Sequence, residues 1–483
     1  MRTDFGAGGT PSRLVTAAEM RDLEGRTIND GCSVERLMER AAQGIAVTIL
    51  RMRAQQLDSI TVVAGPGNNG GDALLAGQFL ASAGCHVEAW QWGRGRPAPM
   101  GVSLPVHRLD SDAVQPFEAT IRRATLVVDG LLGTGRNRPI DDALRGVLRA
   151  LQSVPKHCVV VAVDLPTGVD ADTGEADPDA VRADLTVTLG LAKPGLFQQP
   201  GARHAGQIVV IPLGLSLDAL ERVRGSVIDD FAVGRILPDR PANSNKGTFG
   251  KLLVVGGSQH YTGAPYLAAS AAGRVGAGLV ALAVPSTIQA ILATRAPEYI
   301  FEPLPDDEGS LGARAVDYLR GVIGRYDAVV LGPGVGQTQA SIDAVRDLCV
   351  FLRDLKQPPS VVIDADALNA LALAQNWWTL LPVGSILTPH PGEMARLAGT
   401  SVPIVQADRV AIARGCASTW RQCVVLRGAG TVVASPDGLW SICPLAVPAL
   451  ATAGTGDVLA GAIGGLLAQG LDPFDAARSG VLL

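Results

Sequence analysis

The sequence predicts an α/β protein of two domains, each built on a mostly parallel sheet with helices on both faces. Three observations lead to this prediction. The chain has 483 residues, too long for one typical domain, and 47% of them are hydrophobic, so each half can bury a core. Short β-branched runs alternate with helical stretches in both halves. Glycine-rich loops follow several of these runs, as ligand-binding loops do in open α/β sheets.

The first half begins with helical periodicity over residues 17–53 and continues as alternating strands and helices. A helix is predicted at about 73–84, after a loop of glycine and asparagine. Strands are predicted at 60–64, 125–129, 158–164, 184–189 and 207–211.

The second half opens near residue 243, after a looser stretch that ends in ILPDRPANSN. We therefore predict domains at 1–220 and 243–483, with a linker or lead-in at 221–242. A helix of small residues is predicted at 263–278. Strands are predicted at 251–255, 279–284, 328–331, 360–364, 385–387, 424–426 and 431–434.

Composition excludes several classes of function. The net charge of −5 gives no basic footprint for nucleic acid. The seven cysteines are scattered without a CxxC pair, so neither a disulfide framework nor a zinc site is indicated. The N-terminus lacks the apolar region of a signal peptide, and no uncharged apolar run reaches the roughly 18 residues of a membrane span. We expect a cytoplasmic protein with no membrane partner.

The most informative motif is ALATAGTGDVLAG at 449–461. It places Gly454, Gly456 and Asp457 where a helix is about to start, and small residues there let a phosphate approach the free N–H groups of a helix N-terminus. Asp457, beside that anion hole, is placed to take a proton from a hydroxyl that is being phosphorylated. Alone, the motif is equally consistent with an ordinary glycine-rich turn.

Three loops of the first half carry polar side chains after predicted strands. AGPGNNGGDALLAG contains Asn68, Asn69 and Asp72, although Asp72 alone is equally consistent with a helix N-cap. VVDGLLGTGRNRPI contains Asp129, and VAVDLPTGVDADTG contains Asp164 and Thr167. Loops at the carboxyl ends of parallel strands meet at one edge, so these oxygens suit a hard cation or a phosphate-bearing ligand. Asp164 is the best general acid or base among them.

At these residues the chain resembles the NAD(P)H-hydrate epimerase family, over about 16–215. GPGNNGGD, VDGLLGTG, AVDLPTG and AKPG occur in the family's order. The resemblance implies a Rossmann-like fold that interconverts the R and S hydrates of NADH and NADPH, with Asp164 acting in catalysis and a potassium ion held by Asn69, Asp129 and Thr167. Two loops would contact the hydrate: Asn68, Asn69, Gly70, Gly71 and Asp72 in one, and Gly133, Thr134, Gly135, Arg136, Asn137, Arg138 and Pro139 in the other.

Two positions depart from that family's pattern. Ala73 stands where glycine is commoner, and Thr167 stands where serine is commoner. Threonine keeps the hydroxyl, so the ion site is still expected.

Motifs of the second half also follow a fixed order. NKGTFGK opens a glycine-rich stretch, and LGPGVG, VVIDADALNAL, LTPHPGEMARL and GTGD come after it. Alone, DADALN is typical of a capped strand-to-helix turn, and His390 of a structural hydrogen-bonder. In this order the motifs resemble the NAD(P)H-hydrate dehydratase family, from about 243 to the end of the chain. The resemblance implies a ribokinase-like fold whose bacterial members use ADP.

The resemblance also implies residue roles in this half. The hydrate would contact Gly263, Ala264, Gly336, His390 and Asp457. The nucleotide would contact Arg427, Gly428, Ala429, Gly430, Thr431, Gly454, Thr455 and Gly456. The family usually has lysine where Arg427 stands, and PLAVPALATAG lacks the usual asparagine-glycine pair before the nucleotide loop.

Together these features predict an enzyme that repairs hydrated nicotinamide cofactors. The first domain would equilibrate the R and S hydrates of NADH and NADPH with K⁺. The second would dehydrate the S form with ADP and Mg²⁺, giving AMP and phosphate. We also expect a homo-oligomer. Two alternatives stay open: a ribokinase-like small-molecule kinase with a non-catalytic N-terminal binding module, and a first half that only binds a protein or RNA.

Overall fold

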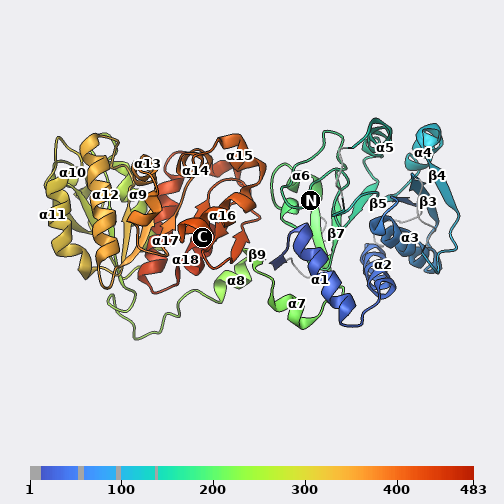
Figure 1. The fold of residues 1–483 in the computed structure, drawn as a ribbon, viewed down its shortest axis with the longest axis horizontal. Helices are drawn as coiled ribbons and strands as arrows, with labels where there is room; N and C mark the ends of the chain where they lie inside the picture. The colour runs from blue at the N-terminus through green and yellow to red at the C-terminus, as the bar shows by residue number, and fades with distance from the viewer. Residues whose placement is uncertain (1–11, 53–58, 94–98, 136–139) are drawn as a thin grey trace. The chain divides into compact units, whose positions relative to one another are not determined.

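The computed structural model describes residues 12–52, 59–93, 99–135 and 140–483. The chain forms two compact units, residues 1–225 and 226–483 (Figure 1). The predicted two-domain α/β architecture is confirmed. The predicted domain boundaries stay a prediction, and within 221–242 the structure forms a short strand and a short helix. Among the described residues, no helix is long and apolar enough to cross a membrane.

The first unit is built on a seven-stranded sheet whose strands are all parallel, in the order β4-β3-β2-β5-β6-β7-β8. The strands are β2 (Ile60–Ala64), β3 (Val87–Trp92), β4 (Val106–Leu109), β5 (Leu126–Gly130), β6 (Val159–Val163), β7 (Leu185–Leu189) and β8 (Gln207–Ile211). The other elements are β1 (Arg13–Leu14), α1 (Ala17–Asn29), α2 (Val34–Arg51), α3 (Asn68–Ser82), η2 (Ser111–Ala113), α4 (Val114–Ile121), α5 (Asp142–Gln152), η3 (Pro194–Leu196), α6 (Ala202–Ala205) and α7 (Leu217–Glu221).

Helices cover both faces of this sheet because successive strand residues point to opposite sides. On β2, Val62 packs into the core under α1, α2 and α3, whereas Val63 packs into the core under α4 and α5. Both side chains are completely buried. A continuous run of β-branched residues, rather than an alternating one, therefore identifies this strand.

The second unit has a longer sheet, in which β9-β18-β17-β16-β15-β14-β13-β10-β11-β12 are neighbours in that order. Its pairs from β12 to β16 are parallel, and β17 and β18 are antiparallel additions. The strands are β9 (Gly225–Val227), β10 (Lys251–Val255), β11 (Leu279–Pro285), β12 (Ile300–Leu304), β13 (Ala328–Leu331), β14 (Ser360–Ile363), β15 (Ile386–Leu387), β16 (Cys423–Leu426), β17 (Val432–Ala434) and β18 (Trp440–Ile442).

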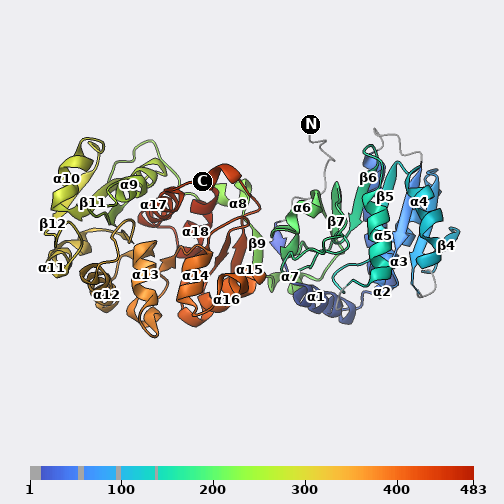
Figure 2. The same cartoon turned by 90° about the horizontal axis from the view of Figure 1, so that it is seen from above.

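Helices flank this sheet on both sides, with α9 and α17 on one side and α12, α13 and α14 on the other (Figure 2). The helices are α8 (Asp230–Gly234), α9 (Gly263–Arg274), α10 (Ser286–Ala293), α11 (Ala313–Val322), η4 (Ile323–Arg325), α12 (Gln339–Asp354), α13 (Asp366–Ala372), η5 (Trp377–Leu380), α14 (Pro391–Leu397), α15 (Val402–Ala407), α16 (Arg409–Trp420), η6 (Pro448–Leu450), α17 (Thr455–Ala468) and α18 (Pro473–Leu482).

The strand order of each sheet reverses at one point. In the first unit the chain runs from β2 out to β4 and returns to β5 on the other side of β2. In the second it runs from β10 out to β12 and returns to β13 on the other side of β10. Such a reversal opens a crevice at the carboxyl ends of the two central strands, which is where ligands bind in open α/β sheets.

Some predicted boundaries were wrong. The helix expected at 73–84 begins at Asn68, so the GNNGGD segment forms its first turns instead of a loop. Its N-cap is Gly67, which rules out the N-cap interpretation of Asp72. The helix expected to reach 278 ends at Arg274. Strands β3, β4 and β12 were missed, because they are partly exposed near sheet edges and carry polar residues.

Helix α17 contacts helix α9 through glycine. A Cβ placed on Gly461 would lie 2.0 Å from the backbone oxygen of Ala268, so no larger residue fits without moving a helix. We expect Gly461→Val to lower the free energy of unfolding by about 3 kcal/mol or more through overpacking. Gly415→Ala is the matched control, since its Cβ meets nothing within 4 Å on the exposed face of α16. The control should be neutral or stabilising by up to about 1 kcal/mol. Chemical unfolding measures both, and equal stabilities would contradict the packing argument.

Candidate functional site

The loop after β2 and the loop after β5 pack together at the reversal point of the first sheet. A Cβ on Gly65 would lie 1.8 Å from the backbone oxygen of Leu131, and a Cβ on Gly70 would lie 2.0 Å from that of Gly65. Only glycine allows these backbones to approach so closely. The glycines therefore bring the start of α3 against the segment that carries Asp129.

Asp129 is completely buried and is held by Thr167. Its Oδ1 accepts from Thr167 Oγ1 at 2.7 Å, and its Oδ2 accepts from the Thr167 N–H at 2.8 Å. Thr167 Oγ1 in turn accepts from the Leu132 N–H at 3.0 Å. Burial raises the pKa of Asp129 to about 6, although these hydrogen bonds favour the charged form. Threonine thus performs the hydroxyl role expected of serine at this position.

Asn69 lies against the same loop, as the potassium prediction requires. A Cβ on Gly133 would lie 3.2 Å from Asn69 Oδ1, and the amide nitrogen assigned as Nδ2 is buried without a partner in the described chain. Amide oxygen and nitrogen are assigned from hydrogen bonds, so an unpartnered amide atom here is equally an unpartnered oxygen. Amide, carboxylate and hydroxyl oxygens, such as those of Asn69, Asp129 and Thr167, are the ligand types that a hard cation prefers.

Asp164 follows β6 with a backbone φ of +66°, a conformation in which non-glycine residues are uncommon. Its Oδ1 accepts from the Nζ of Lys193, from Thr188 Oγ1 at 3.3 Å and from the Leu189 N–H at 3.2 Å. Lys193 was missed as a functional residue, although it lies in the AKPG motif. The signal that was available is a lysine in an otherwise apolar stretch.

Two further carboxyl groups lie close to this ion pair. Asp72, in α3, is 8% exposed, and burial together with the charges of Asp164 and Glu24 raises its pKa well above the ordinary value. Burial also raises the pKa of Glu24, which comes from α1, and the neighbouring Lys193 partly opposes that rise. Helical periodicity alone gave no reason to select Glu24. Of the predicted hydrate contacts, residues 136–139 lie outside the described part of the chain.

In the second unit, the GTGD motif forms the predicted helix start. Gly454 precedes α17 with φ +89°, and Thr455, Gly456 and Asp457 form the first turn. Burial raises the pKa of Asp457 to about 6, with Asp364 and Asp366 adding to the rise and Arg427 opposing it. A carboxylate with this pKa at a helix N-terminus is suited to act as a general base near neutral pH.

Arg427 connects the GTGD turn to the TPHPGE segment. Its Nη2 donates to Glu393 Oε2 at 2.9 Å and lies 3.3 Å from Asp364 Oδ1. A Cβ on Gly456 would lie 1.9 Å from Arg427 Nη1, so the other arm of the guanidinium covers this turn. Two carboxylates therefore fix the arginine while one arm faces the predicted anion hole. A lysine, with one nitrogen, does not offer this fork.

His390 has a structural role that the sequence left open. It is the N-cap of α14, and its Nδ1 accepts from the N–H groups of Gly392 at 3.0 Å and Glu393 at 3.4 Å. Burial lowers the pKa of His390. The neutral ring therefore carries its proton on Nε2, which lies 3.5 Å from Glu393 Oε1.

The other predicted contacts lie around the reversal point of the second sheet. Gly263 begins α9, and the Cβ of Ala264 would lie 3.1 Å from one placed on Gly334. The N–H of Gly336 donates to Asp366 Oδ2 at 2.9 Å, which fixes the loop after β13. The structure thus places LGPGVG beside the start of α9.

A buried arginine, Arg409, donates hydrogen bonds to the backbone at the start of the RGAGT loop. The sequence did not predict this contact. The Nη2 of Arg409 donates to the carbonyls of Leu426 at 2.9 Å and Arg427 at 3.1 Å. Its Nη1 donates to Gln406 Oε1 at 2.7 Å. Burial lowers the pKa of Arg409 to about 10. The positive charge therefore lies directly beneath the loop that was predicted to hold phosphates.

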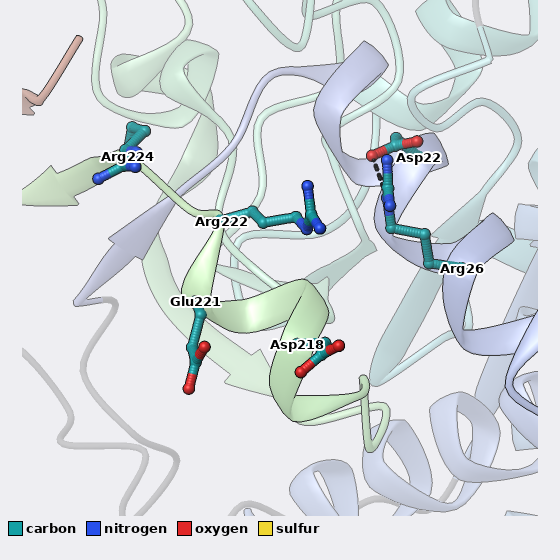
Figure 3. A pocket seen from close by; sticks show the side chains of 6 residues that line it. All are labelled: Asp22, Arg26, Asp218, Glu221, Arg222 and Arg224. Carbon is teal, nitrogen blue, oxygen red and sulfur yellow. Dashed lines mark hydrogen bonds and ion pairs between the residues drawn. The ribbon is translucent and has the colours of Figure 1, made fainter. Parts of the chain in front are cut away.

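A surface cavity of about 600 Å³ in the first unit belongs to neither predicted site (Figure 3). Its lining has three acidic and three basic side chains, from Asp22, Arg26, Asp218, Glu221, Arg222 and Arg224. Asp22 and Arg26 pair with each other at 2.7 Å on α1. The lining therefore has equal numbers of acidic and basic side chains, which gives the cavity no clear preference for a charged ligand.

Comparison with known proteins identifies the family. A family model described as NAD(P)H-hydrate dehydratase matches residues 252–483, and one described as YjeF-related protein N-terminus matches residues 34–195. The bifunctional NAD(P)H-hydrate repair enzyme of Moorella thermoacetica is 38% identical over 97% of this chain and 91% of its own length. The enzyme of the same description from Thermofilum pendens is 35% identical over 94% and 87%.

The chain belongs to the family of bifunctional NAD(P)H-hydrate repair enzymes. The family resemblance inferred from the motifs is confirmed. Among solved structures, the ADP/ATP-dependent NAD(P)H-hydrate dehydratase of Bacillus subtilis, co-crystallised with ATP and Mg²⁺, is 31% identical, covering 53% of this chain and 85% of that one with a TM-score of 0.44. The individual site residues stay predictions.

Thr167 offers a test of the loop that contains Asp129. We expect Thr167→Val to lower the free energy of unfolding by about 1–3 kcal/mol, since it removes a hydroxyl that both donates to Asp129 and accepts from Leu132. Thr167→Ser keeps the hydroxyl and should cost about 1 kcal/mol for the lost methyl. Urea unfolding in potassium-free buffer compares the two. A valine variant as stable as the serine variant would show that the hydroxyl does not hold this loop.

Proposed function

We propose that the first unit interconverts the R and S hydrates of NADH and NADPH, and that the second removes water from the S hydrate with ADP, giving AMP and phosphate. The observation that carries the proposal is the pair of strand-order reversals, each with a carboxylate at its carboxyl edge: the buried Asp164 in the first unit and the half-buried Asp457 in the second. The near-full-length similarity to bifunctional repair enzymes supports it.

In the second unit each group has a definite task. Asp457 takes the proton of the substrate hydroxyl, which then attacks the terminal phosphoryl group of ADP. The N–H groups at the start of α17 and the free arm of Arg427 stabilise the charge that develops on that group. Phosphorylation turns the hydroxyl into a good leaving group, and its departure as phosphate, with loss of a proton from the neighbouring ring carbon, restores the double bond of the reduced ring.

The residues of this site fit a magnesium ion that binds together with the phosphates of the nucleotide. Among the described residues no cluster of three or more histidine, cysteine or acidic side chains is arranged to hold a metal ion. Asp364 has a completely buried Oδ2 that finds no partner in the described part of the chain, and Mg²⁺ usually binds one or two carboxylates plus substrate phosphates. When bound, the ion would neutralise phosphate charge.

Potassium in the first unit, held by Asn69, Asp129 and Thr167, is part of the same proposal. So are the domain boundaries 1–220 and 243–483, a homo-oligomeric state and a cytoplasmic location. In the first unit Asp164 acts in catalysis, and the start of α3 and the loop at 133–135 contact the hydrate.

One assay tests the whole proposal. Mixed R and S hydrates of NADH are supplied with Mg²⁺ and either ADP or ATP, and the reduced-nicotinamide absorbance is followed to completion. Full recovery, faster than spontaneous epimerisation allows, requires both activities. Asp164→Ala should stop after the S hydrate is consumed. A stable phosphorylated product without recovered absorbance would instead indicate a small-molecule kinase.

Asp457→Asn separates the two activities. We expect dehydration to fall by about 10²–10⁴-fold because the general base is lost, while epimerisation by the first unit is unchanged. In the wild-type chain, kcat/KM for dehydration should rise with pH through about 6 and then level off, because Asp457 accepts a proton only when ionised. Steady-state kinetics between pH 5 and pH 8, as a rough range, measures this limb. Retention of more than about a tenth of the activity in Asp457→Asn would rule out the base role.

Arg427 is the test of nucleotide binding. Its removal leaves Glu393 and Asp364 without their cation at a site for phosphates, so Arg427→Ala should raise the Kd for ADP about 10- to 150-fold. Arg427→Lys should restore part of the affinity. Calorimetric titration with ADP measures these values, with the exposed Arg325→Ala as the control. Unchanged affinity in Arg427→Ala would mean that backbone N–H groups and another residue hold the phosphates.

A further inference from the structure

Four ionisable side chains from four separate segments meet at the carboxyl edge of the first sheet. Asp164 follows β6, Lys193 precedes η3, Asp72 belongs to α3 and Glu24 belongs to α1. Asp72 and Glu24 each respond to the charge of Asp164, and Glu24 also responds to that of Lys193. Buried ionisable groups collect in this way at functional sites more often than elsewhere.

Lys193 is the only buried lysine in the part of the chain that the structure describes, with 1% of its surface exposed. Its ammonium group donates to Asp164 Oδ1, to the carbonyl of Leu189 at 2.8 Å and, at 3.4 Å, to Thr188 Oγ1. A buried ammonium without such partners is strongly unfavourable. The three acceptors therefore satisfy the hydrogen bonds of this ammonium group and fix its position.

Asp164 is held on one side only. The contacts that described residues make with its carboxylate all fall on Oδ1. The backbone φ of +66° is a further constraint that directs this side chain. Oδ2 is consequently the oxygen left to meet a substrate.

The environment of Asp72 differs from that of Asp164. Asp72 is buried, and burial together with the negative charges of Asp164 and Glu24 raises its pKa well above the ordinary value. The two carboxyl groups are thus separated in environment, because Asp164 has an ammonium partner whereas Asp72 is buried beside like charges. This separation is how a site obtains an acid and a base from the same residue type.

We propose that Lys193 is a positioning residue of the epimerase site, which fixes Asp164 as the proton acceptor and leaves Asp72 as the proton donor. The inference rests on the proposed epimerase function. In the hydrate, one carbon bears both the hydroxyl and the ring nitrogen. Asp164 takes the hydroxyl proton, the carbon–nitrogen bond breaks with its electron pair passing to nitrogen, and Asp72 protonates that nitrogen. The planar carbonyl carbon then closes on its other face, and both protons return.

The test uses the full chain and separated R hydrate. Lys193→Met keeps the length of the side chain but removes the charge. We expect kcat for epimerisation to fall about 100-fold while KM changes less than about threefold, since Lys193 touches Asp164 and not the substrate. The acidic limb of kcat should move to higher pH by about 1–3 units, because a carboxylate without its cation binds a proton more tightly. Dehydration of S hydrate by the second unit gives the concentration of folded enzyme.

Thr186→Val is the matched control. It removes a buried hydrogen bond, to the carbonyl of Ala205, on the same strand β7 but outside the cluster. Its epimerase kcat should stay within about threefold of wild type and its pH profile should not move.

Chemical rescue separates positioning from simple structural support. Lys193→Ala leaves space for a small cation, so propylammonium should restore epimerisation in a saturable manner, whereas Lys193→Met, with the space filled, should not respond. The proposal is overturned if Lys193→Met keeps wild-type kcat and pH profile, or if Lys193→Ala is inactive and amines do not restore it. A wild-type chain that fails to interconvert the hydrates would overturn the proposed function instead.

Discussion

The close approach of two backbones at each reversal point is the constraint on which both sites depend. Gly65 and Gly70 let the loop after β2 meet the loop after β5, and Gly256 does the same between β10 and β13, where a Cβ would lie 2.4 Å from the Pro333 oxygen. A side chain at any of these positions would separate the two loops. The parallel strands then set the direction of the loops, because neighbouring parallel strands end at the same edge of their sheet.

Charge at these edges is stabilised in pairs. Asp129 is held by Thr167, Asp164 by Lys193, and Arg427 by Glu393 and Asp364. Two of these pairings leave a group uncommitted among the described residues: Oδ2 of Asp164 in the first unit, and the arm of Arg427 over Gly456 in the second. The fixed partners therefore orient Asp164 and Arg427 and leave one atom or arm of each for a substrate. Little reorganisation is then needed when a ligand binds.

Buried strands and motif loops were predictable because their signals are local. Val62 and Val63 lie in an unbroken β-branched run, which indicates a strand buried on both faces. Partly exposed strands such as β12 carry no such run, and α3 began five residues early because glycine and asparagine favour loops in isolation but tolerate a helix against a packed neighbour. His390 is a further example. The sequence left its role open, and the N–H groups of the helix that it caps decide it.

The sequence by itself determined the class of protein, the two α/β halves, the family and most of the loops that carry chemistry. It did so because the spacing of glycines and the carboxylates that follow strands are local features, which can be recognised within a few consecutive residues. Only the tertiary structure decided which charges meet. Glu24 and Lys193 are separated by more than a hundred residues from each other but belong to one cluster, and Arg427 reaches Glu393 from a different strand loop. Electrostatic partners depend on distance in space, which strand order sets and residue order does not.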